Sequence, residues 1–108
     1  MDNVEKLVRE GKVAVVYSPG YGAGWSSWNA KIAESLMFDK KIAIAVLDGD
    51  YKKVKQIALD IDPNAYLSEA AIEDLRVAWL EIGEKFFIKE YDGWETIVLM
   101  KNFKTFEA

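Results

Sequence analysis

The sequence predicts an α+β fold: a single domain over residues 1–108, with an antiparallel or mixed sheet of about four strands and helices packed on one face. Three patterns support this class. Residues 12–17 form a β-branched run of the length of a buried strand, central segments show helical spacing of apolar residues, and the C-terminal third alternates around the turn signal Asp92-Gly93. With 108 residues and 51% hydrophobic content, the chain can bury one core.

The N-terminal part is predicted to contain helix, strand and helix. Asp2 or Asn3 can cap a short helix with Val4, Leu7 and Val8 on one face, and Gly11 would end it in the left-handed conformation. The strand over 12–17 follows and ends at Ser18-Pro19-Gly20. A helix capped by Ser27 or Asn29 is then expected to run to about Met37.

The rest of the chain is predicted to add two helices and three strands. Residues 41–47 fit a helix or a strand, and we prefer the helix. A further helix carries Val54, Ile57, Ala58 and Ile61 and ends before Asp62-Pro63. Strands over 75–80, 85–91 and 94–100 would form an antiparallel meander.

The predicted hairpin at Asp92-Gly93 has a defined register. One face pairs Phe86 with Leu99, Ile88 with Ile97 and Glu90 with Glu95, and the strand over 75–80 can extend this inner face with Leu75, Val77 and Trp79. The other face pairs Tyr91 with Trp94, Lys89 with Thr96 and Phe87 with Val98, and it is more apolar than a solvated surface. A second subunit, the N-terminal helix or the tail over 103–106 could cover it.

Glu90 opposite Glu95 is unusual, because like charges across a strand pair are destabilising. A cation, an arginine or a ligand group between them would remove the repulsion. We favour the simpler interpretation, in which the strand end is solvated and the repulsion is small.

Composition excludes several classes of function. A net charge of −4 and a pI near 4.8 provide no basic stripe for nucleic acid. No apolar run approaches the length of a membrane span, and the N-terminus lacks a signal-peptide layout, so a cytoplasmic protein is expected. Without cysteine or histidine there is no disulfide, thiolate metal site, Ser-His-Asp triad or His-ligated metal. We therefore expect no cofactor, no metal and no enzymatic activity.

The segment from Tyr17 to Asn29 is the strongest candidate site, since it holds three glycines and two tryptophans directly after a strand. Glycines at 20, 22 and 24 would permit positive φ and close approach to a ligand, and exposed main-chain amides can hold an anion. Tyr21, Trp25 and Trp28 offer stacking surfaces beside polar Ser18, Ser26 and Asn29. The glycine spacing matches neither nucleotide-binding fingerprint. Alternatively, the glycines only form a tight turn while Trp25 and Trp28 fill the core.

Four segments carry a resemblance to a family. The loop Gly20-Tyr-Gly-Ala-Gly-Trp-Ser-Ser-Trp-Asn29, together with 36–39, 64–66 and 87–93, resembles a family of small proteins of tailed phages and prophages over residues 13–97. The family loop, Gly-x-Gly-Ala-Gly-Trp-Ser-x-Trp-Asn, is matched by Gly20, Gly22, Ala23, Gly24, Trp25, Ser26, Trp28 and Asn29. The chain has Lys40 where a proline often follows the aspartate. The resemblance implies a phage origin, with the host cytoplasm as location, and a shared site.

The predicted function is non-catalytic binding of a small anionic, nucleotide-derived ligand. Such a phage protein could act as an anti-defence sponge for an immune signalling nucleotide, of the cyclic ADP-ribose type or a cyclic oligonucleotide, and a homo-oligomer is expected. The predicted ligand-binding residues are Ser18, Gly20, Tyr21, Gly22, Ala23, Gly24, Trp25, Ser26, Trp28, Asn29, Glu90, Tyr91 and Asp92. Three alternatives remain: an inhibitor that binds a host protein through the apolar sheet face, a nucleotide-acting enzyme using Asp39, Glu90 or Asp92, and a structural module of the phage particle.

Overall fold

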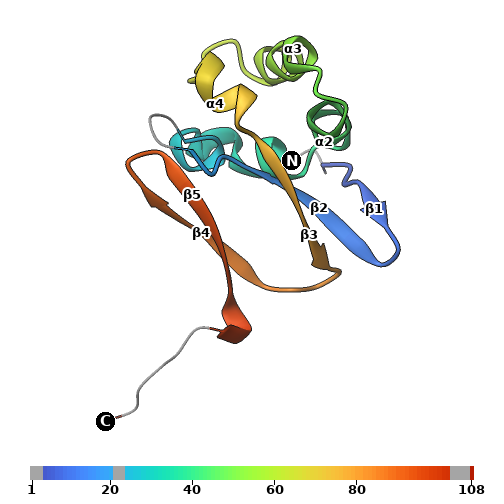
Figure 1. Cartoon of the computed structure of the whole chain (residues 1–108), viewed down its shortest axis with the longest axis vertical. Helices are drawn as coiled ribbons and strands as arrows, with labels where there is room; N and C mark the ends of the chain where they lie inside the picture. Colours follow the sequence, from blue (N-terminus) through green and yellow to red (C-terminus); the bar gives the residue numbers. More distant parts are fainter. Residues whose placement is uncertain (1–3, 21–23, 103–107) are drawn as a thin grey trace.

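Two antiparallel sheets and a group of helices make up the computed structural model, which describes residues 4–20, 24–102 and 108 (Figure 1). The first sheet has the strand order β1-β2-β3, formed by Val8–Arg9, Lys12–Tyr17 and Arg76–Glu81. The second is the hairpin of β4 (Phe86–Tyr91) and β5 (Trp94–Leu99). The α+β class is confirmed, and the described part contains five strands in two sheets, where about four in one sheet were expected.

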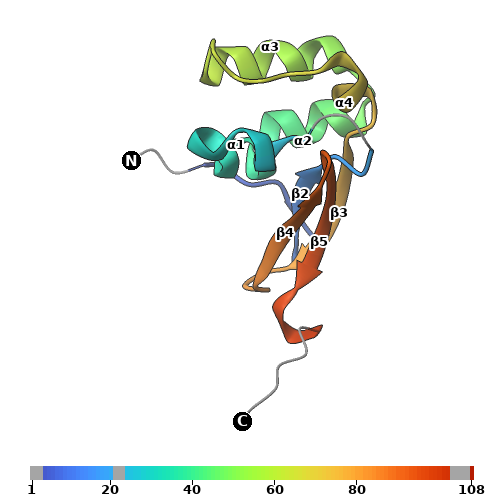
Figure 2. The same ribbon diagram turned by 90° about the vertical axis from the view of Figure 1, so that its left-hand side faces the viewer.

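The helices lie at one end and on one face of the larger sheet (Figures 1 and 2). They are α1 (Ala33–Phe38), α2 (Lys40–Leu47), α3 (Tyr51–Ile61) and α4 (Glu69–Glu73), preceded by short 3₁₀ turns over Ser26–Trp28 and Ala30–Ile32. Helices α1 and α2 contact β2, and α3 packs outside α2. None of the described helices combines the length and the apolar character that crossing a membrane requires.

Strand β2 is buried on both faces, which explains its continuous apolar run. Ala14 and Val16 belong to the core formed with the helices, where each is 0% exposed. Val15 points to the opposite face, towards the hairpin, and is also buried at 1% exposure. The hairpin therefore forms a third layer over the sheet face that the helices leave uncovered.

The predicted meander of the last three strands is wrong, because β3 pairs with β2 and not with β4. The β2–β3 register runs from Lys12 opposite Glu81 to Tyr17 opposite Arg76. After β3, the Ile82 amide donates to the Gly11 carbonyl at 3.2 Å, and the chain then turns away at Gly83, where φ is 84°. This short irregular connection lets the hairpin fold over the sheet instead of extending it.

The predicted N-terminal helix is also wrong. Val8 lies in β1, the Leu7 carbonyl accepts a hydrogen bond from Ala14 at 2.9 Å, and the Glu5 carbonyl accepts one from Lys40 at 2.8 Å. So short a helix is marginal by itself, whereas the extended segment gains main-chain bonds to two neighbouring elements. Gly11 does have positive φ, 77°, but in the turn between β1 and β2.

The other helix predictions agree more closely with the structure. Residues 40–47 form helix α2, capped by Asp39, whose side chain accepts from the Ile42 amide at 3.0 Å. Helix α3 begins after its cap Asp50 and ends before Asp62, as expected. The helix expected from Ser27 or Asn29 to Met37 is divided into two 3₁₀ turns and α1, and neither residue caps it with its side chain. Both side chains are used elsewhere, as described below.

The hairpin register is confirmed at all six residue pairs. Asp92 and Gly93 both have positive φ, 50° and 85°, as a two-residue turn between twisted strands requires. On the outer face, Tyr91 is 74% exposed, Trp94 39% and Phe87 37%. The sequence analysis named the N-terminal helix and the segment 103–106 as possible covers for this face. The helix does not form among the described residues, and the segment 103–106 lies outside them.

Candidate functional site

The glycine-rich loop holds an anion, and this anion is the side chain of Glu95. The Glu95 carboxylate accepts from the main-chain amides of Ser18 at 2.9 Å, Trp25 at 2.8 Å and Ser27 at 2.9 Å. The Ser27 hydroxyl donates to the same Oε2 that accepts from Trp25 and Ser27. Glu95 is 0% exposed, so these donors replace the water that a carboxylate would otherwise bind. We call this arrangement the Glu95 clasp.

The clasp joins three distant parts of the chain. Ser18 follows β2, Trp25 and Ser27 lie at the first 3₁₀ turn, and Glu95 is the second residue of β5, 68 to 77 positions further along. The Glu95 amide also donates to the Ser18 carbonyl at 2.8 Å, which fixes the start of β5 against the end of β2. The clasp therefore holds the hairpin on the sheet.

The clasp also explains the pairing of Glu90 with Glu95. The solvated strand end that we favoured is wrong for Glu95, which is fully buried. Glu90 is exposed, and its carboxylate accepts from the Gly93 amide at 2.8 Å in the turn. The loop donors thus do what a cation, an arginine or a ligand group was considered to do, and the two carboxylates have separate partners.

Gly20 and Gly24 are needed for close packing and not for positive φ, which neither residue has. A Cβ atom at Gly24 would lie 2.5 Å from the Ser27 Oγ and 2.7 Å from Cδ1 of Trp28. A Cβ at Gly20 would lie 2.7 Å from a carboxylate oxygen of Asp74. The chain itself, and not a ligand, makes these close approaches.

The two loop tryptophans have different environments. Trp25 is 1% exposed, belongs to the core and donates its indole N–H to the Leu36 carbonyl at 2.8 Å. The alternative interpretation, a tryptophan that fills the core, therefore holds for Trp25, and its ring presents no surface for stacking. Trp28 is 36% exposed and keeps an accessible face.

Asn29 positions a second exposed ring beside Trp28. Its side-chain carbonyl accepts from the Tyr66 amide at 2.8 Å, and its amide group donates to the carbonyls of Tyr66 at 3.0 Å and Trp25 at 2.8 Å. Tyr66, 55% exposed, then lies with its ring centroid 5.4 Å from that of Trp28, at an interplanar angle of 55°. We call Trp28 and Tyr66 the aromatic pair.

The remaining predicted site residues do not converge on one cavity. Ser18 and Ser26 are buried at 0% and 2% exposure, while Tyr91 and Asp92 are exposed at the hairpin tip. Tyr21, Gly22 and Ala23 lie outside the described residues. Asp39, a possible catalytic acid, serves as the cap of α2. Among the described residues, no group of three acidic side chains is arranged to hold a metal ion.

Sequence reasoning missed Glu95 and Tyr66 as parts of this region. Two signals pointed to Glu95: an unexplained pair of like charges, and a loop rich in amides suited to an anion. Each was considered separately, because their proximity depends on the packing of the hairpin against the loop. The only sequence signal for Tyr66 was its position in the segment 64–66, one of the segments that resemble the phage family.

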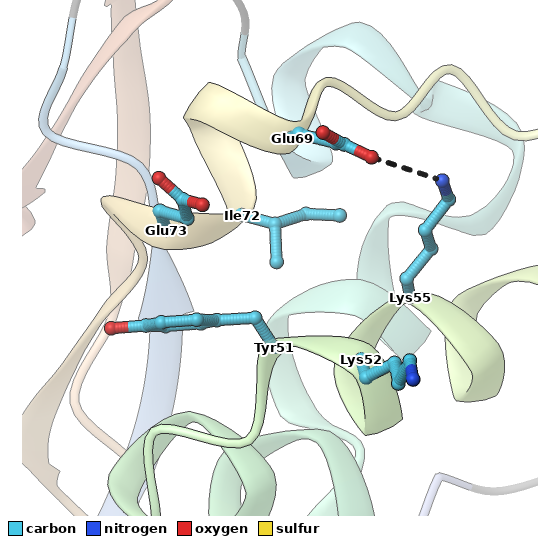
Figure 3. A pocket seen from close by; sticks show the side chains of 6 residues that line it. All are labelled: Tyr51, Lys52, Lys55, Glu69, Ile72 and Glu73. Carbon is cyan, nitrogen blue, oxygen red and sulfur yellow. Dashed lines mark ion pairs between the residues drawn. The ribbon is translucent and has the colours of Figure 1, made fainter.

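The structure also contains surface hollows. A hollow of about 280 Å³ lies where the larger sheet meets the hairpin and is lined by Tyr17, Pro19, Ala78, Trp94, Glu95, Thr96 and Ile97. Another, of about 400 Å³, lies between α3 and α4 (Figure 3).

Comparison of the chain with models of protein families, with curated proteins and with solved structures found no match.

Proposed function

We propose that the protein binds a small nucleotide-derived ligand without changing it chemically, and that a ring of the ligand stacks on the aromatic pair. The observation that carries the proposal is the use of the buried Asn29, whose side chain makes two of its three hydrogen bonds to the main chain of Tyr66. These bonds hold a largely exposed ring next to an exposed indole.

The geometry of the pair favours planar ligands. One side of the Trp28 ring packs closely against Gly24, where a Cβ would lie 2.7 Å from its Cδ1. With the main chain of Tyr66 held by Asn29 and the Trp28 ring packed on Gly24, the two rings present neighbouring apolar surfaces, and part of the cost of ordering them is met before a ligand binds. Base stacking on such rings typically contributes about 1–3 kcal/mol per base.

The anionic part of the ligand needs donors other than those first predicted. The amides of Ser18, Trp25 and Ser27 already donate to Glu95. Lys31, exposed and three residues after Trp28, is the lysine nearest to the loop in sequence. In this proposal the glycine loop shapes the binding surface, and exposed side chains around it contact the phosphate.

The phage resemblance determines which ligands to test first. Immune signalling nucleotides, including cyclic ADP-ribose isomers and cyclic oligonucleotides, combine planar bases with negative charge. A homo-oligomer that sequesters such a signal in the host cytoplasm is the biological role that we propose.

A retention assay tests the proposal. The purified protein is incubated with each nucleotide, washed, heated and analysed by mass spectrometry, and intact ligand should be recovered. Trp28→Ala and Tyr66→Ala should abolish retention, whereas Tyr91→Ala, which removes an exposed ring on the hairpin, should not. Failure to retain any of the nucleotides, or equal retention by all three variants, would count against the proposal. Recovery of a converted product would indicate the enzyme alternative.

A second candidate function is inhibition of a host protein through the outer face of the hairpin. The exposed fractions of Phe87, Tyr91 and Trp94, 37%, 74% and 39%, favour a protein contact there. Tyr91→Ala should then abolish capture of the host protein from lysate, while Tyr66→Ala leaves it intact. Capture that depends on Tyr66 instead would contradict this second candidate.

A further inference from the structure

Helices α3 and α4 line an open surface hollow that the proposed function does not use. Its volume of about 400 Å³ falls within the range of roughly 300–1,000 Å³ that is typical of small-molecule sites. It is lined by Tyr51, Lys52 and Lys55 of α3 and by Glu69, Ile72 and Glu73 of α4 (Figure 3).

Both lysines of the hollow lie at one end of it, where Glu69 pairs with Lys55, and Glu73 lies at the other end (Figure 3). Lys52 and Lys55, three residues apart on α3, project from one face of the helix and lie to the right in Figure 3. Glu73 and the phenol oxygen of Tyr51 lie to the left, with Ile72 between the two ends. The end with two lysines and one carboxylate and the end with the Glu73 carboxylate thus flank the Ile72 side chain.

The middle of the hollow suits a flat ring. Ile72 is 3% exposed and belongs to the core, so its position is fixed by packing. Tyr51 is 44% exposed and extends its ring across the hollow below Ile72 (Figure 3). An aromatic face and an aliphatic side chain together can contact a planar ring.

Lys55 is available to a ligand although it pairs with Glu69. The Lys55 Nζ lies 3.7 Å from the Glu69 Oε1, and the two side chains are 46% and 86% exposed. Exposed pairs of this kind are weak and are screened by salt. A phosphate, which carries more charge and presents three acceptor oxygens, can therefore compete with the Glu69 carboxylate for Lys55.

We propose that this hollow binds an anion of the size of a nucleoside monophosphate whose planar ring carries an amino group. The phosphate contacts Lys52 and Lys55, the ring lies against Tyr51 and Ile72, and the amino group donates to the Glu73 carboxylate. The site shares no residue with the aromatic pair, so it can be tested independently of the function proposed above.

Titration of the full chain with AMP, followed by amide chemical shifts at low salt, tests the inference. AMP should shift the resonances of residues 51–55 and 69–73 saturably. The double variant Lys52→Ala/Lys55→Ala should weaken binding about tenfold, since charged hydrogen bonds are lost. Lys53→Ala is the matched control: this exposed lysine belongs to the same helix but does not line the hollow, and its loss should leave the affinity within about twofold.

The ring contacts have their own test. IMP, which has a carbonyl in place of the amino group, should bind more weakly than AMP, and Glu73→Ala should remove that difference. Inorganic phosphate should bind more weakly than either nucleotide. The proposal is overturned by the absence of saturable AMP binding up to about 10 mM, by equal affinity in the double lysine variant, or by phosphate binding as tightly as AMP. Shifts confined to the surroundings of Trp28 and Tyr66 would also overturn it and would instead support the aromatic pair.

Discussion

Replacing Glu95 by alanine should be among the most destabilising single changes in this chain. The Ser18 and Trp25 amides, on residues that are 0% and 1% exposed, would lose their carboxylate acceptor. Each buried donor left unsatisfied costs about 1–3 kcal/mol, so these two alone correspond to about 2–6 kcal/mol. Small domains are stable by roughly 5–15 kcal/mol, so Glu95→Ala should remove a large part of the total.

Glu95→Gln separates hydrogen bonding from packing. The glutamine carbonyl can take the place of Oε2 and keep the bonds from Trp25 and Ser27. Its NH₂ group would then face the Ser18 amide, which is also a donor. We expect a loss of about 1–3 kcal/mol, smaller than that of the alanine variant, because one unsatisfied contact remains instead of several.

Urea denaturation monitored by tryptophan fluorescence measures these differences as shifts in the midpoint at constant slope. Glu90→Ala and Glu90→Gln are the controls, because Glu90 occupies the paired position on β4 but is exposed; each should change the free energy of unfolding by about 1 kcal/mol or less. The reasoning is refuted if Glu95 and Glu90 variants have equal stability. If Glu95→Ala does not fold, the comparison of the two glutamine variants still decides the question.

Three further predictions concern the loop and the hairpin. Gly24→Ala should destabilise the fold by about 1–3 kcal/mol, since the new Cβ meets the Trp28 ring. Gly20→Ala should cost less, because the exposed Asp74 side chain can move away from the new Cβ. The melting temperatures of the two variants, measured by thermal unfolding, test this difference. Asn29→Ala should lower the free energy of unfolding by about 1–3 kcal/mol and should abolish the nuclear Overhauser contacts between the rings of Trp28 and Tyr66. Persistence of these contacts would show that Asn29 does not position Tyr66. Gly93→Ala should lower the free energy of unfolding by about 1–2 kcal/mol, because the φ of 85° at this position is strained for any residue with a side chain. An unchanged melting temperature would contradict the turn assignment.

Local patterns predicted most of the elements correctly. Helix α3 was recognisable from its apolar spacing and from the aspartates at its two ends, and the hairpin from a turn dipeptide that permits a single register. The β-branched run of β2 indicated a buried strand. In each case the information that identifies the element lies within a few residues, although packing against the rest of the chain stabilises it.

Errors arose where a distant partner decides the conformation. Val8 was predicted to lie in a helix, but pairing with β2 and with the segment at Asp39 made the extended form favourable. Ser27 and Asn29 looked like helix caps, yet their side chains bond to Glu95 and to Tyr66, 68 and 37 positions further along. No local pattern distinguishes these uses of a serine or an asparagine from a cap.

By itself, the sequence determined the class of fold and the hairpin register, because each follows from short-range geometry and residue chemistry, and it indicated a loop rich in amide donors that it assigned to a ligand. Only the tertiary structure decided that the anion is Glu95, that Trp25 belongs to the core, and that Trp28 shares its exposed surface with Tyr66. These outcomes depend on how the hairpin and the segment before α4 pack against the loop. Such packing is a property of the whole chain, since a buried carboxylate is stable only where several distant donors meet it.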